Sequence, residues 1–423
     1  MIPASGPYRL TGARVPAAMA EGLGHADAQG FVTCDLTVAD GRIGGTGGPE
    51  IPIRGAIVLP GLVDCHTHLD KGHIWARKPN PDGTFMGALT SVAEDRGARW
   101  TAGDVRARIE FSLRSAYARG TVAIRTHLDS GDHRTASSWE MASDAREAWA
   151  GRITLQMAAL TTLEAVESDA YRETADLVAR HGGVLGAVTY PLLDNSERLR
   201  TFFRLAVERG LDVDFHADET LDPASQTLGQ IADAVIETGY EGRVLCGHCC
   251  SLSTMAEAEA DRILDRVAEA GLSIVSLPMC NLYLQDRVPG RTPRYRGITL
   301  VHEMRARGIP VSFASDNTRD PFYAYGDMDM LEVWREATRI AHLDHPVGDW
   351  PAAFASAPAQ ALGLEAGVIA EGRPADLIIV PGARSWTELL SRPHADRIVI
   401  RGGRAIDTTL PAYAELDPLM ETP

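Results

Sequence analysis

Eight short apolar runs, each followed by a helix-like segment, constrain the fold of this 423-residue chain more than any other sequence feature. Strands that alternate with helices form parallel sheets, and eight such units suit a closed (β/α)8 barrel. An open doubly wound sheet is the rival fold, but no glycine-rich phosphate loop follows the first run. The strands are expected at residues 57–64, 121–127, 153–158, 184–188, 213–216, 243–247, 273–277 and 310–314.

Both ends of the chain have a different sequence pattern, with β-like segments in place of alternating strands and helices. Residues 1–57 alternate short β-like pieces with glycine turns, and β-like segments return after Gly363, at 376–380 and 397–401. We therefore expect an α/β protein in which residues 58–363 form the barrel. Residues 1–57 and 364–423 are expected to pair into one small, discontinuous β-sandwich domain.

Charge and cysteine usage limit the partners and the compartment. The formal net charge is −16, from 41 basic and 57 acidic residues, so a nucleic-acid polymer is not an expected partner. The start of the chain lacks the features of a secretory signal, and no apolar run is long enough to cross a bilayer, so no membrane partner is expected. The six cysteines are irregularly spaced, as in proteins of a reducing compartment. These features predict a cytoplasmic protein.

The strongest chemical signal is the pair His66 and His68, which directly follows the first apolar run. In a strand, residues i and i+2 point to the same side, here toward the end of a barrel where active sites lie. His216, His248 and Asp316 end the fifth, sixth and eighth runs in the same way. Imidazoles and a carboxylate that converge at one place are ligands for a transition metal. The sequence therefore predicts a metal site.

The order of these motifs resembles a known family. The motifs at residues 60–70 (PGLVDCHTHLD), 216–219, 247–248 and 315–316 resemble the signature of the amidohydrolase superfamily. The motifs at residues 125–129, 281–285, 296–299 and 320–323 are similar to its cytosine deaminase branch. The resemblance runs from about residue 57 to 380, and it implies a distorted (β/α)8 TIM-type barrel with a flanking β-sandwich. It also allows for a homo-oligomer, although no interface can be identified from one chain.

The resemblance implies a mononuclear metal site. His66, His68, His216 and Asp316 would bind one divalent ion, Zn²⁺ or Fe²⁺, and leave room for water. Binuclear members of the superfamily use a carboxylated lysine after the fourth strand. The only lysines of this chain are Lys71 and Lys78, which precede that strand, so a bridging lysine is excluded.

The resemblance also implies the reaction. A metal-bound hydroxide would attack a small amino-heterocycle, such as a cytosine-like pyrimidine, and ammonia would leave. Glu219 would carry a proton to the ring, Asp316 would accept one from water, and His248 would hold the developing oxyanion or the amine. Gln156 would bind the amide edge of the ring, since an amide offers both a donor and an acceptor.

The expected substrate wall departs from that of cytosine deaminases. Asn317 stands where those enzymes have a second aspartate, and Phe322, Phe85 and Tyr283 replace a tryptophan, a leucine and a histidine. The base is therefore left open. The alternatives are hydrolysis of a ring amide, removal of an alkylamine from an N-alkylamino-s-triazine, and a non-catalytic binding or scaffold role.

Three further residues keep open roles. His127 ends the second run, and the resemblance favours a structural role for it over direct metal binding. Lys71 and Arg77 follow the His-x-His pair closely, and ion pairs with Asp70 or Asp129 are favoured over contact with a ligand.

Overall fold

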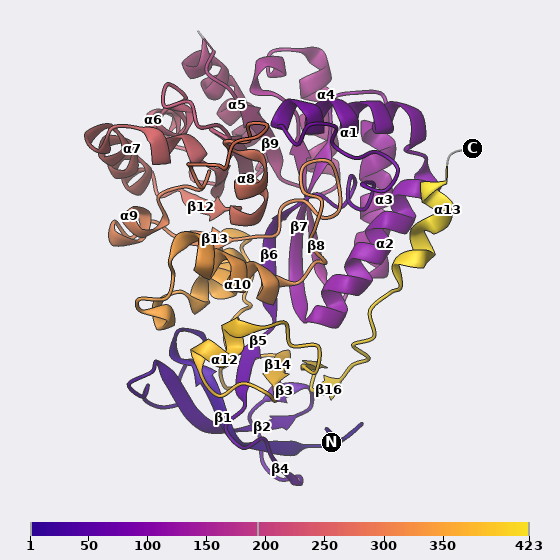
Figure 1. Cartoon of the computed structure of the whole chain (residues 1–423), viewed down its shortest axis with the longest axis vertical. Coiled ribbons are helices and arrows are strands. Elements are labelled where there is room, and N and C mark those ends of the chain that lie inside the picture. Colours follow the sequence, from indigo (N-terminus) through magenta and orange to yellow (C-terminus); the bar gives the residue numbers. More distant parts are fainter. Residues whose placement is uncertain (1, 193, 422–423) are drawn as a thin grey trace.

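A barrel of eight parallel strands forms the main body of the computed structural model, which describes residues 2–192 and 194–421 (Figure 1). Each strand carries buried apolar residues, as expected where helices cover a parallel sheet. In chain order, the barrel strands are β6 (Leu62–Thr67), β7 (Thr121–Asp129), β8 (Thr154–Leu160), β9 (Leu185–Thr189), β10 (Val213–Ala217), β11 (Val244–His248), β12 (Ser273–Ser276) and β13 (Val311–Phe313).

The barrel closes through two weak seams. Strands β6, β7 and β8 form one parallel sheet, and β9 to β13 form another in sequence order. Isolated parallel bridges join the two sheets, at Ala158 with Val184 and at Thr162 with Val188 on one side, and at Thr67 with Asp316 on the other. The barrel is therefore distorted, and one of its seams lies beside the predicted metal ligands.

The helices cover the barrel with their apolar faces. Phe202 and Phe203 of α5 contact Phe215 of β10, with ring centroids 4.7 and 6.0 Å apart. Because strand residues alternate, Phe215 faces the helices while its neighbour His216 faces the barrel interior.

No helix in the described part of the chain is long and apolar enough to span a membrane. The helices are α1 (Phe85–Arg99), α2 (Ala102–Arg119), α3 (Thr135–Ala148), α4 (Asp169–Arg180), α5 (Asn195–Arg209), α6 (Thr227–Thr238), α7 (Glu257–Glu269), α8 (Pro278–Leu284), α9 (Val301–Ala306), α10 (Met330–Ala341), α11 (Ser356–Ala361), α12 (Trp386–Ser391) and α13 (Asp417–Met420).

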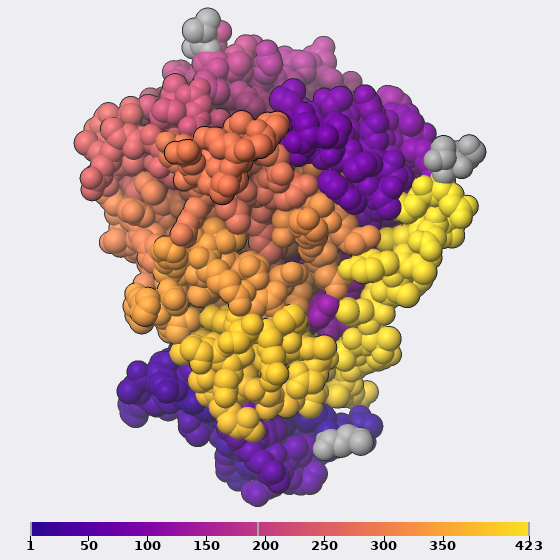
Figure 2. All heavy atoms as spheres, viewed as in Figure 1, coloured from indigo at the N-terminus to yellow at the C-terminus, as the bar shows by residue number. Residues whose placement is uncertain are grey.

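The two ends of the chain share a separate β domain, which encloses its own apolar core. Figure 2 shows the N-terminal and C-terminal segments as one continuous lower lobe. The order of its strands is β16-β15-β14-β5-β1-β2-β3, with β4 paired to β1. The predicted α/β architecture, a barrel with a small β-sandwich built from both termini, is confirmed. These strands are β1 (Tyr8–Pro16), β2 (Phe31–Ala39), β3 (Arg42–Ile43), β4 (Glu50–Pro52), β5 (Ile57–Pro60), β14 (Leu377–Val380), β15 (Ile398–Arg401) and β16 (Arg404–Ala405).

The first apolar run is two strands, not one. β5 pairs with β14 in the terminal β domain, and β6 begins the barrel after Gly61. A Cβ atom on Gly61 would lie 1.9 Å from Cγ1 of Val122, so only glycine allows the chain to pass this close to β7. The change from sandwich to barrel, predicted at residue 57, therefore lies at Gly61.

The C-terminal segment also differs from the expectation. After β16 the chain leaves the β domain and runs back along the barrel to α13, beside α2 (Figure 1). Arg114 of α2 pairs with Glu415 at 2.5 Å, and Arg99 donates to the carbonyl oxygen of Leu419 at 3.1 Å. The segment from Glu415 to Met420 thus packs on the barrel and not in the sandwich.

Candidate active site

The seam between β6 and β13 brings the first metal-site candidates together. The backbone N–H of Asp316 donates to the carbonyl oxygen of His66 at 2.9 Å, and that of His68 donates to the carbonyl oxygen of Asp316 at 3.2 Å. Thr67, between the two histidines, donates its hydroxyl to the same Asp316 oxygen at 2.7 Å. The barrel closure itself therefore fixes the aspartate against the His-x-His pair.

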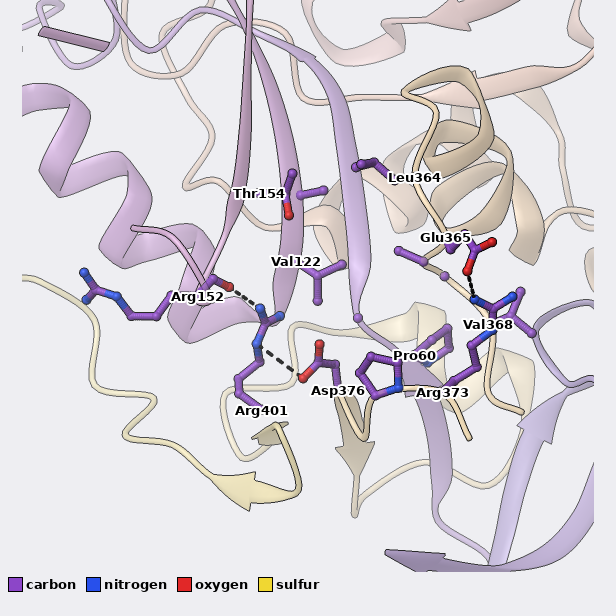
Figure 3. Close-up of a pocket in the computed structure, with 16 residues that line it drawn as sticks. Pro60, Val122, Arg152, Thr154, Leu364, Glu365, Val368, Arg373, Asp376 and Arg401 are labelled. Atoms are coloured by element: carbon purple, nitrogen blue, oxygen red, sulfur yellow. Dashed lines mark hydrogen bonds and ion pairs between the residues drawn. The ribbon is translucent and has the colours of Figure 1, made fainter. Parts of the chain in front are cut away.

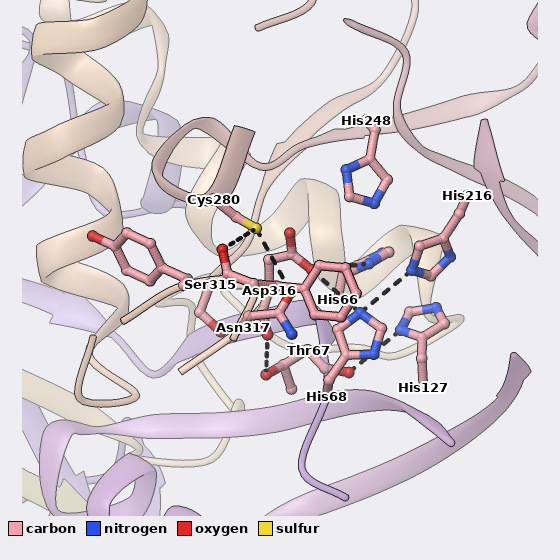
Figure 4. A network of polar contacts seen from close by, with 12 residues as sticks. His66, Thr67, His68, His127, His216, His248, Cys280, Ser315, Asp316 and Asn317 are labelled. Carbon is pink, nitrogen blue, oxygen red and sulfur yellow. Dashed lines mark hydrogen bonds and ion pairs between the residues drawn. The ribbon is translucent and has the colours of Figure 1, made fainter. Parts of the chain in front are cut away.

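All four predicted ligands converge at this point, as Figure 4 shows. Oδ1 of Asp316 lies 3.2 Å from Nε2 of His68 and 3.6 Å from Nε2 of His66. Nε2 of His216 lies 3.3 Å from Nε2 of His68. Each of the four side chains is at most 6% exposed. The ends of β6 and β10 and the loop after β13 thus place three imidazoles and one carboxylate within reach of a single point.

The donor set fits one divalent cation. Both ring nitrogens of His66 and both carboxylate oxygens of Asp316 are buried without a hydrogen-bond partner among the described residues. Buried polar groups are normally satisfied, so this cluster needs something that pairs with all of them. Two ligands about 2.1 Å from a tetrahedral cation lie about 3.4 Å apart, which matches the observed spacings. The fourth barrel strand, β9, is not followed by a lysine that could bridge two cations, which agrees with a site for a single cation.

A glycine makes room for the first ligand. Gly247 lies on β11, directly before His248. A Cβ atom at Gly247 would lie 3.0 Å from Cε1 and 3.2 Å from Nδ1 of His66. Any larger residue would therefore push the imidazole of His66 away from the other ligands.

His127 lies against the ligands but faces the protein. Its ring centroid is 4.0 Å from that of His66, so its position alone would allow metal binding. However, its Nε2 lies 3.0 Å from Oδ1 of Asp214, and its Nδ1 lies 3.4 Å from the carbonyl oxygen of Thr67. Both ring nitrogens thus lie near protein oxygen atoms, as expected for a structural histidine, although Nε2 makes no hydrogen bond among the described residues.

Burial sets the protonation of the site. It lowers the pKa of His66, His68 and His216 well below 6.5, so that these imidazoles are neutral and able to bind a cation. Burial raises the pKa of Asp316 to about 7. It also raises the pKa of Glu219 well above 4.5, and the nearby charge of Asp316 adds to this effect. Glu219 therefore holds a proton more readily than an exposed glutamate does.

Glu219 and His248 form the second half of the site. Oε1 of Glu219 lies 3.4 Å from Nδ1 of His248, and burial lowers the pKa of His248 to about 3. Asn281 of α8 lies 3.0 Å from the same Nδ1 and 3.5 Å from Oε1 of Glu219, through its Nδ2. Gln285 donates to the carbonyl oxygen of Glu219 at 3.2 Å. Nε2 of His248 is left without a partner among the described residues.

Asn281 is a site residue for which the sequence predicted no role. It belongs to the motif at residues 281–285, which served only to mark the resemblance. The available signal was the spacing of Asn281 and Gln285, since residues four apart on a helix lie on the same face. Its contact with both His248 and Glu219 could not be read from the sequence.

A cavity of about 290 Å³ opens beside the four ligands. Phe85 of α1 and Phe322 lie edge to face in its wall, with ring centroids 5.6 Å apart at 70°. Asn317 also lines the cavity, although its Nδ2 donates to Oδ2 of Asp320 at 2.7 Å. With His248, four of the six side chains expected at the substrate therefore lie in this wall, and Tyr283 does not line it. Further lining residues include Lys71, Leu89, Arg96, Ser130, Thr161, Thr162, Val188 and Tyr190.

The structure does not bring Gln156 to the cavity, and its predicted contact with substrate is not supported. Gln156 lies in the middle of β8, and the cavity is lined by Leu160 and the residues that follow it. Its Oε1 accepts from Nη2 of Arg125 at 2.9 Å, and its Nε2 donates to the carbonyl oxygen of Leu362 at 2.8 Å. The strand runs further than residue 158, where the apolar pattern ends, so the glutamine lies too deep.

Lys71 and Arg77 have different surroundings in the structure. Arg77 pairs with Asp95 at 2.8 Å and with Asp104, so it is a structural residue, although its partners differ from those expected. Lys71 pairs with Asp129 at 2.6 Å as expected, but it also lines the cavity.

A second cavity, of about 480 Å³, lies at the other end of the barrel (Figure 3). Four of its five charged side chains are paired with each other: Arg373 lies 2.6 Å from Glu365, and Arg401 lies 3.8 Å from Asp376. None of the histidines of the ligand cluster lines it. The chemistry is therefore expected at the first cavity.

Comparisons with known proteins agree with this geometry. The sequence model of the amidohydrolase family matches residues 113–407. A pterin deaminase of Rhizobium rhizogenes is 50% identical over 98% of this chain and 97% of its own length. An N-isopropylammelide isopropyl amidohydrolase of Pseudomonas sp. is 24% identical over 89% of this chain and 92% of its own. Among solved structures, a 5-methylcytosine deaminase from Klebsiella pneumoniae has a TM-score of 0.79 at 25% identity, covering 94% of this chain and 97% of that one.

Proposed function

The chain belongs to the amidohydrolase family, and we propose that it is a metal-dependent deaminase that hydrolyses the exocyclic amine of a pterin. The protein is a hydrolase that acts on carbon–nitrogen bonds other than peptide bonds, and it is a hydrolytic deaminase of a heterocycle. The finer assignment of the ring is our proposal. The observation that carries it is the 50% identity with a pterin deaminase along almost the whole of both chains.

One divalent cation, Zn²⁺ or Fe²⁺, is proposed to bind to His66, His68, His216 and Asp316. Borderline-soft cations favour imidazole nitrogen together with carboxylate oxygen, and the unpartnered atoms of the cluster are of these two kinds. When bound, such a cation supplies Lewis-acid activation of water at neutral pH. Because the three imidazoles are already neutral, they can bind the cation without first losing protons.

The side chains around the cation would move the protons of the reaction. Glu219, whose carboxyl pKa is raised by burial well above 4.5, would donate a proton to the ring nitrogen beside the carbon that carries the amine. This makes that carbon electrophilic. Asp316, with a pKa raised to about 7, would accept a proton from the attacking water. His248, fixed by Asn281, would hold the developing charge with its free Nε2.

The reaction balances without another reagent. The water oxygen becomes the new ring carbonyl oxygen, and the amine takes up a proton and leaves as ammonia. Glu219 and Asp316 end with the number of protons they had at the start.

The cavity suits a flat aromatic base. Phe85 and Phe322 supply the apolar wall, and a volume of about 290 Å³ is at the small end of ligand cavities, which run from about 300 to 1,000 Å³. The exposed Leu89 and Tyr190 at its edge, each 41% exposed, leave room for substituents of the second ring of a pteridine.

Ammonia release from pterin, measured with protein loaded with zinc or iron, tests the proposal. Cytosine and an N-alkylamino-s-triazine serve as comparison substrates. We expect the largest kcat/KM for pterin. For the Glu219→Gln variant we expect ammonia release slower by about 10²-fold to 10⁴-fold, at a metal content equal to that of the wild type. Metal-loaded wild-type protein that releases no ammonia from any aminopteridine would overturn the proposal.

The relative that acts on N-isopropylammelide supports one alternative, the removal of an alkylamine from a triazine. The same set of residues would serve, because the bond that breaks is again between ring carbon and exocyclic nitrogen. The product separates the two functions. Isopropylamine from N-isopropylammelide, at a higher kcat/KM than ammonia from pterin, would favour the alternative.

A further inference from the structure

Lys71 places an ammonium group in the wall of the catalytic cavity. It is 4% exposed, and it follows the metal-site His68 by three residues. Its Nζ donates to Oδ1 of Asp129 at 2.6 Å and lies 5.9 Å from the ring centroid of Phe322. An ammonium has three N–H donors and no acceptor. Asp129 is its one hydrogen-bond partner among the described residues, which leaves two donors for a molecule in the cavity.

A fixed network holds this ammonium. The other oxygen of Asp129, Oδ2, lies 3.2 Å from Nη1 of Arg96 on α1. The backbone N–H of Asp129 donates to Oδ2 of Asp70, the residue before Lys71, at 2.8 Å. The end of β7 and the segment after β6 are thus tied to each other around the ion pair. A donor held in this way is preorganised for a ligand, since little side-chain entropy is lost on binding.

The amide group that was predicted to donate to the substrate ring is absent from the cavity. Gln156 lies outside it, with its amide bound to Arg125 and to Leu362. The Nδ2 of Asn317 is used by Asp320. Lys71 lines the same cavity as Glu219 and Asp316, so the ammonium lies in the wall that the reacting groups share.

We propose that Lys71 determines specificity by donating a hydrogen bond to a ring carbonyl oxygen of the substrate. This inference rests on the proposed function and narrows it, since it restricts the substrate class to amino-heterocycles that carry an oxo group near the amine. An ammonium cannot accept a hydrogen bond, so it selects an acceptor on the ring. A site built around a buried polar group rejects an analogue that leaves this group unpaired.

Pterin and 2-aminopteridine form the test pair, because they differ in the 4-oxo group and the ring N–H that accompanies it. Their kcat/KM values are measured with the metal-loaded wild type, Lys71→Met and Lys71→Arg. Lys78→Met is the matched control, since Lys78 is the other lysine of the chain, is 33% exposed in its side chain and pairs with Glu94 outside the cavity. The double variant Lys71→Met/Asp129→Asn removes both charges of the ion pair, and it keeps the test available if the single Met variant does not fold.

We expect the wild type and Lys78→Met to prefer pterin by about 100-fold or more. Lys71→Met and the double variant should lose most of this preference through a lower kcat/KM for pterin, with 2-aminopteridine nearly unaffected. Lys71→Arg, which keeps a donor, should retain a preference for pterin.

Equal losses on both compounds, or no loss on either, would overturn the role of Lys71 and leave the deaminase function intact. A wild type that releases ammonia from neither compound would instead overturn the proposed function, and this inference with it.

Discussion

Nε2 of His127 lies 3.0 Å from Oδ1 of Asp214, directly below the ligand cluster. Asp214 precedes His216 by two residues on β10, so both side chains point into the barrel. The second oxygen of Asp214 accepts from Nη1 of Arg125 at 2.9 Å, and all three of these interior side chains are at most 1% exposed. The layer beneath the predicted metal ligands is therefore a buried polar network that holds His127 beside Asp214.

Removing one member of this network should destabilise the fold. Asp214→Ala leaves the guanidinium of Arg125 buried without its counter-charge, so we expect a loss of about 3 to 5 kcal/mol in the free energy of unfolding. Urea denaturation measures this loss. Asp212→Ala is the control, because Asp212 precedes β10 by one residue and pairs with Arg243 in a more exposed position, where about 1 kcal/mol or less is expected. Equal losses in the two variants would contradict the buried network.

Glu219→Gln should separate proton transfer from metal binding. The amide cannot donate its proton to the ring as an acid does, so we expect kcat to fall by about 10²-fold to 10⁴-fold. Elemental analysis should find the same metal content as in the wild type. Glu208→Gln, at an exposed carboxylate of α5, should have no effect on kcat. A Glu219→Gln variant with normal kcat would rule out the proposed acid.

Metal removal should abolish turnover and weaken the fold. A ligand that binds only the native state raises the midpoint of thermal unfolding, so a chelator should lower it and added Zn²⁺ or Fe²⁺ should restore it. We expect one bound ion per chain in the wild type and much less than one in His216→Ala. Two ions per chain, bound with similar affinity, would contradict the mononuclear assignment.

Gln156→Ala distinguishes the structural role of this residue from the substrate contact that the sequence predicts. The change leaves Arg125 and the carbonyl oxygen of Leu362 with one partner fewer, so we expect a loss of about 1 to 3 kcal/mol in stability. Both kinetic constants, kcat and KM, should stay close to those of the wild type. Unchanged stability together with a much weaker apparent affinity for substrate would return Gln156 to the substrate site.

His73 should make the stability depend on pH. Burial lowers its pKa to about 3 from an ordinary value of 6.5, with further effects from the charges of Arg319 and Arg108. The unfolded chain therefore takes up a proton below pH 6.5 that the native state does not bind, and stability falls as the pH drops from 6.5 toward 3.

His73→Leu removes this proton uptake. Both ring nitrogens of His73 lack a partner among the described residues, and the ring packs on Phe111 at 4.8 Å, so leucine keeps the apolar contact. The left-handed backbone at φ 63° should make the variant less stable by about 1 to 2 kcal/mol at every pH, which leaves the pH dependence readable. Denaturation between pH 8 and pH 4.5 should show a smaller loss of stability for the variant. Parallel pH curves for the two proteins would disprove the effect.

The sequence by itself determined the barrel and which side chains gather at its proposed metal site. Apolar runs alternate with helices, and strand periodicity sends His66, His68 and His216 to one side, because both patterns are local and repeat over a few residues. The order of the motifs then indicated the family, and the comparisons confirm it.

Only the tertiary structure decided which polar side chains reach the cavity. Gln156 lies on a barrel strand and Lys71 follows one. How close each side chain comes to the cavity depends on where its strand ends in space. It also depends on distant partners, which are Leu362 for Gln156 and Asp129 for Lys71. The same holds for Asn281, which meets His248 and Glu219 across three separate elements. Contacts between residues far apart in the chain depend on the closure of the barrel, and no local pattern of residues encodes them.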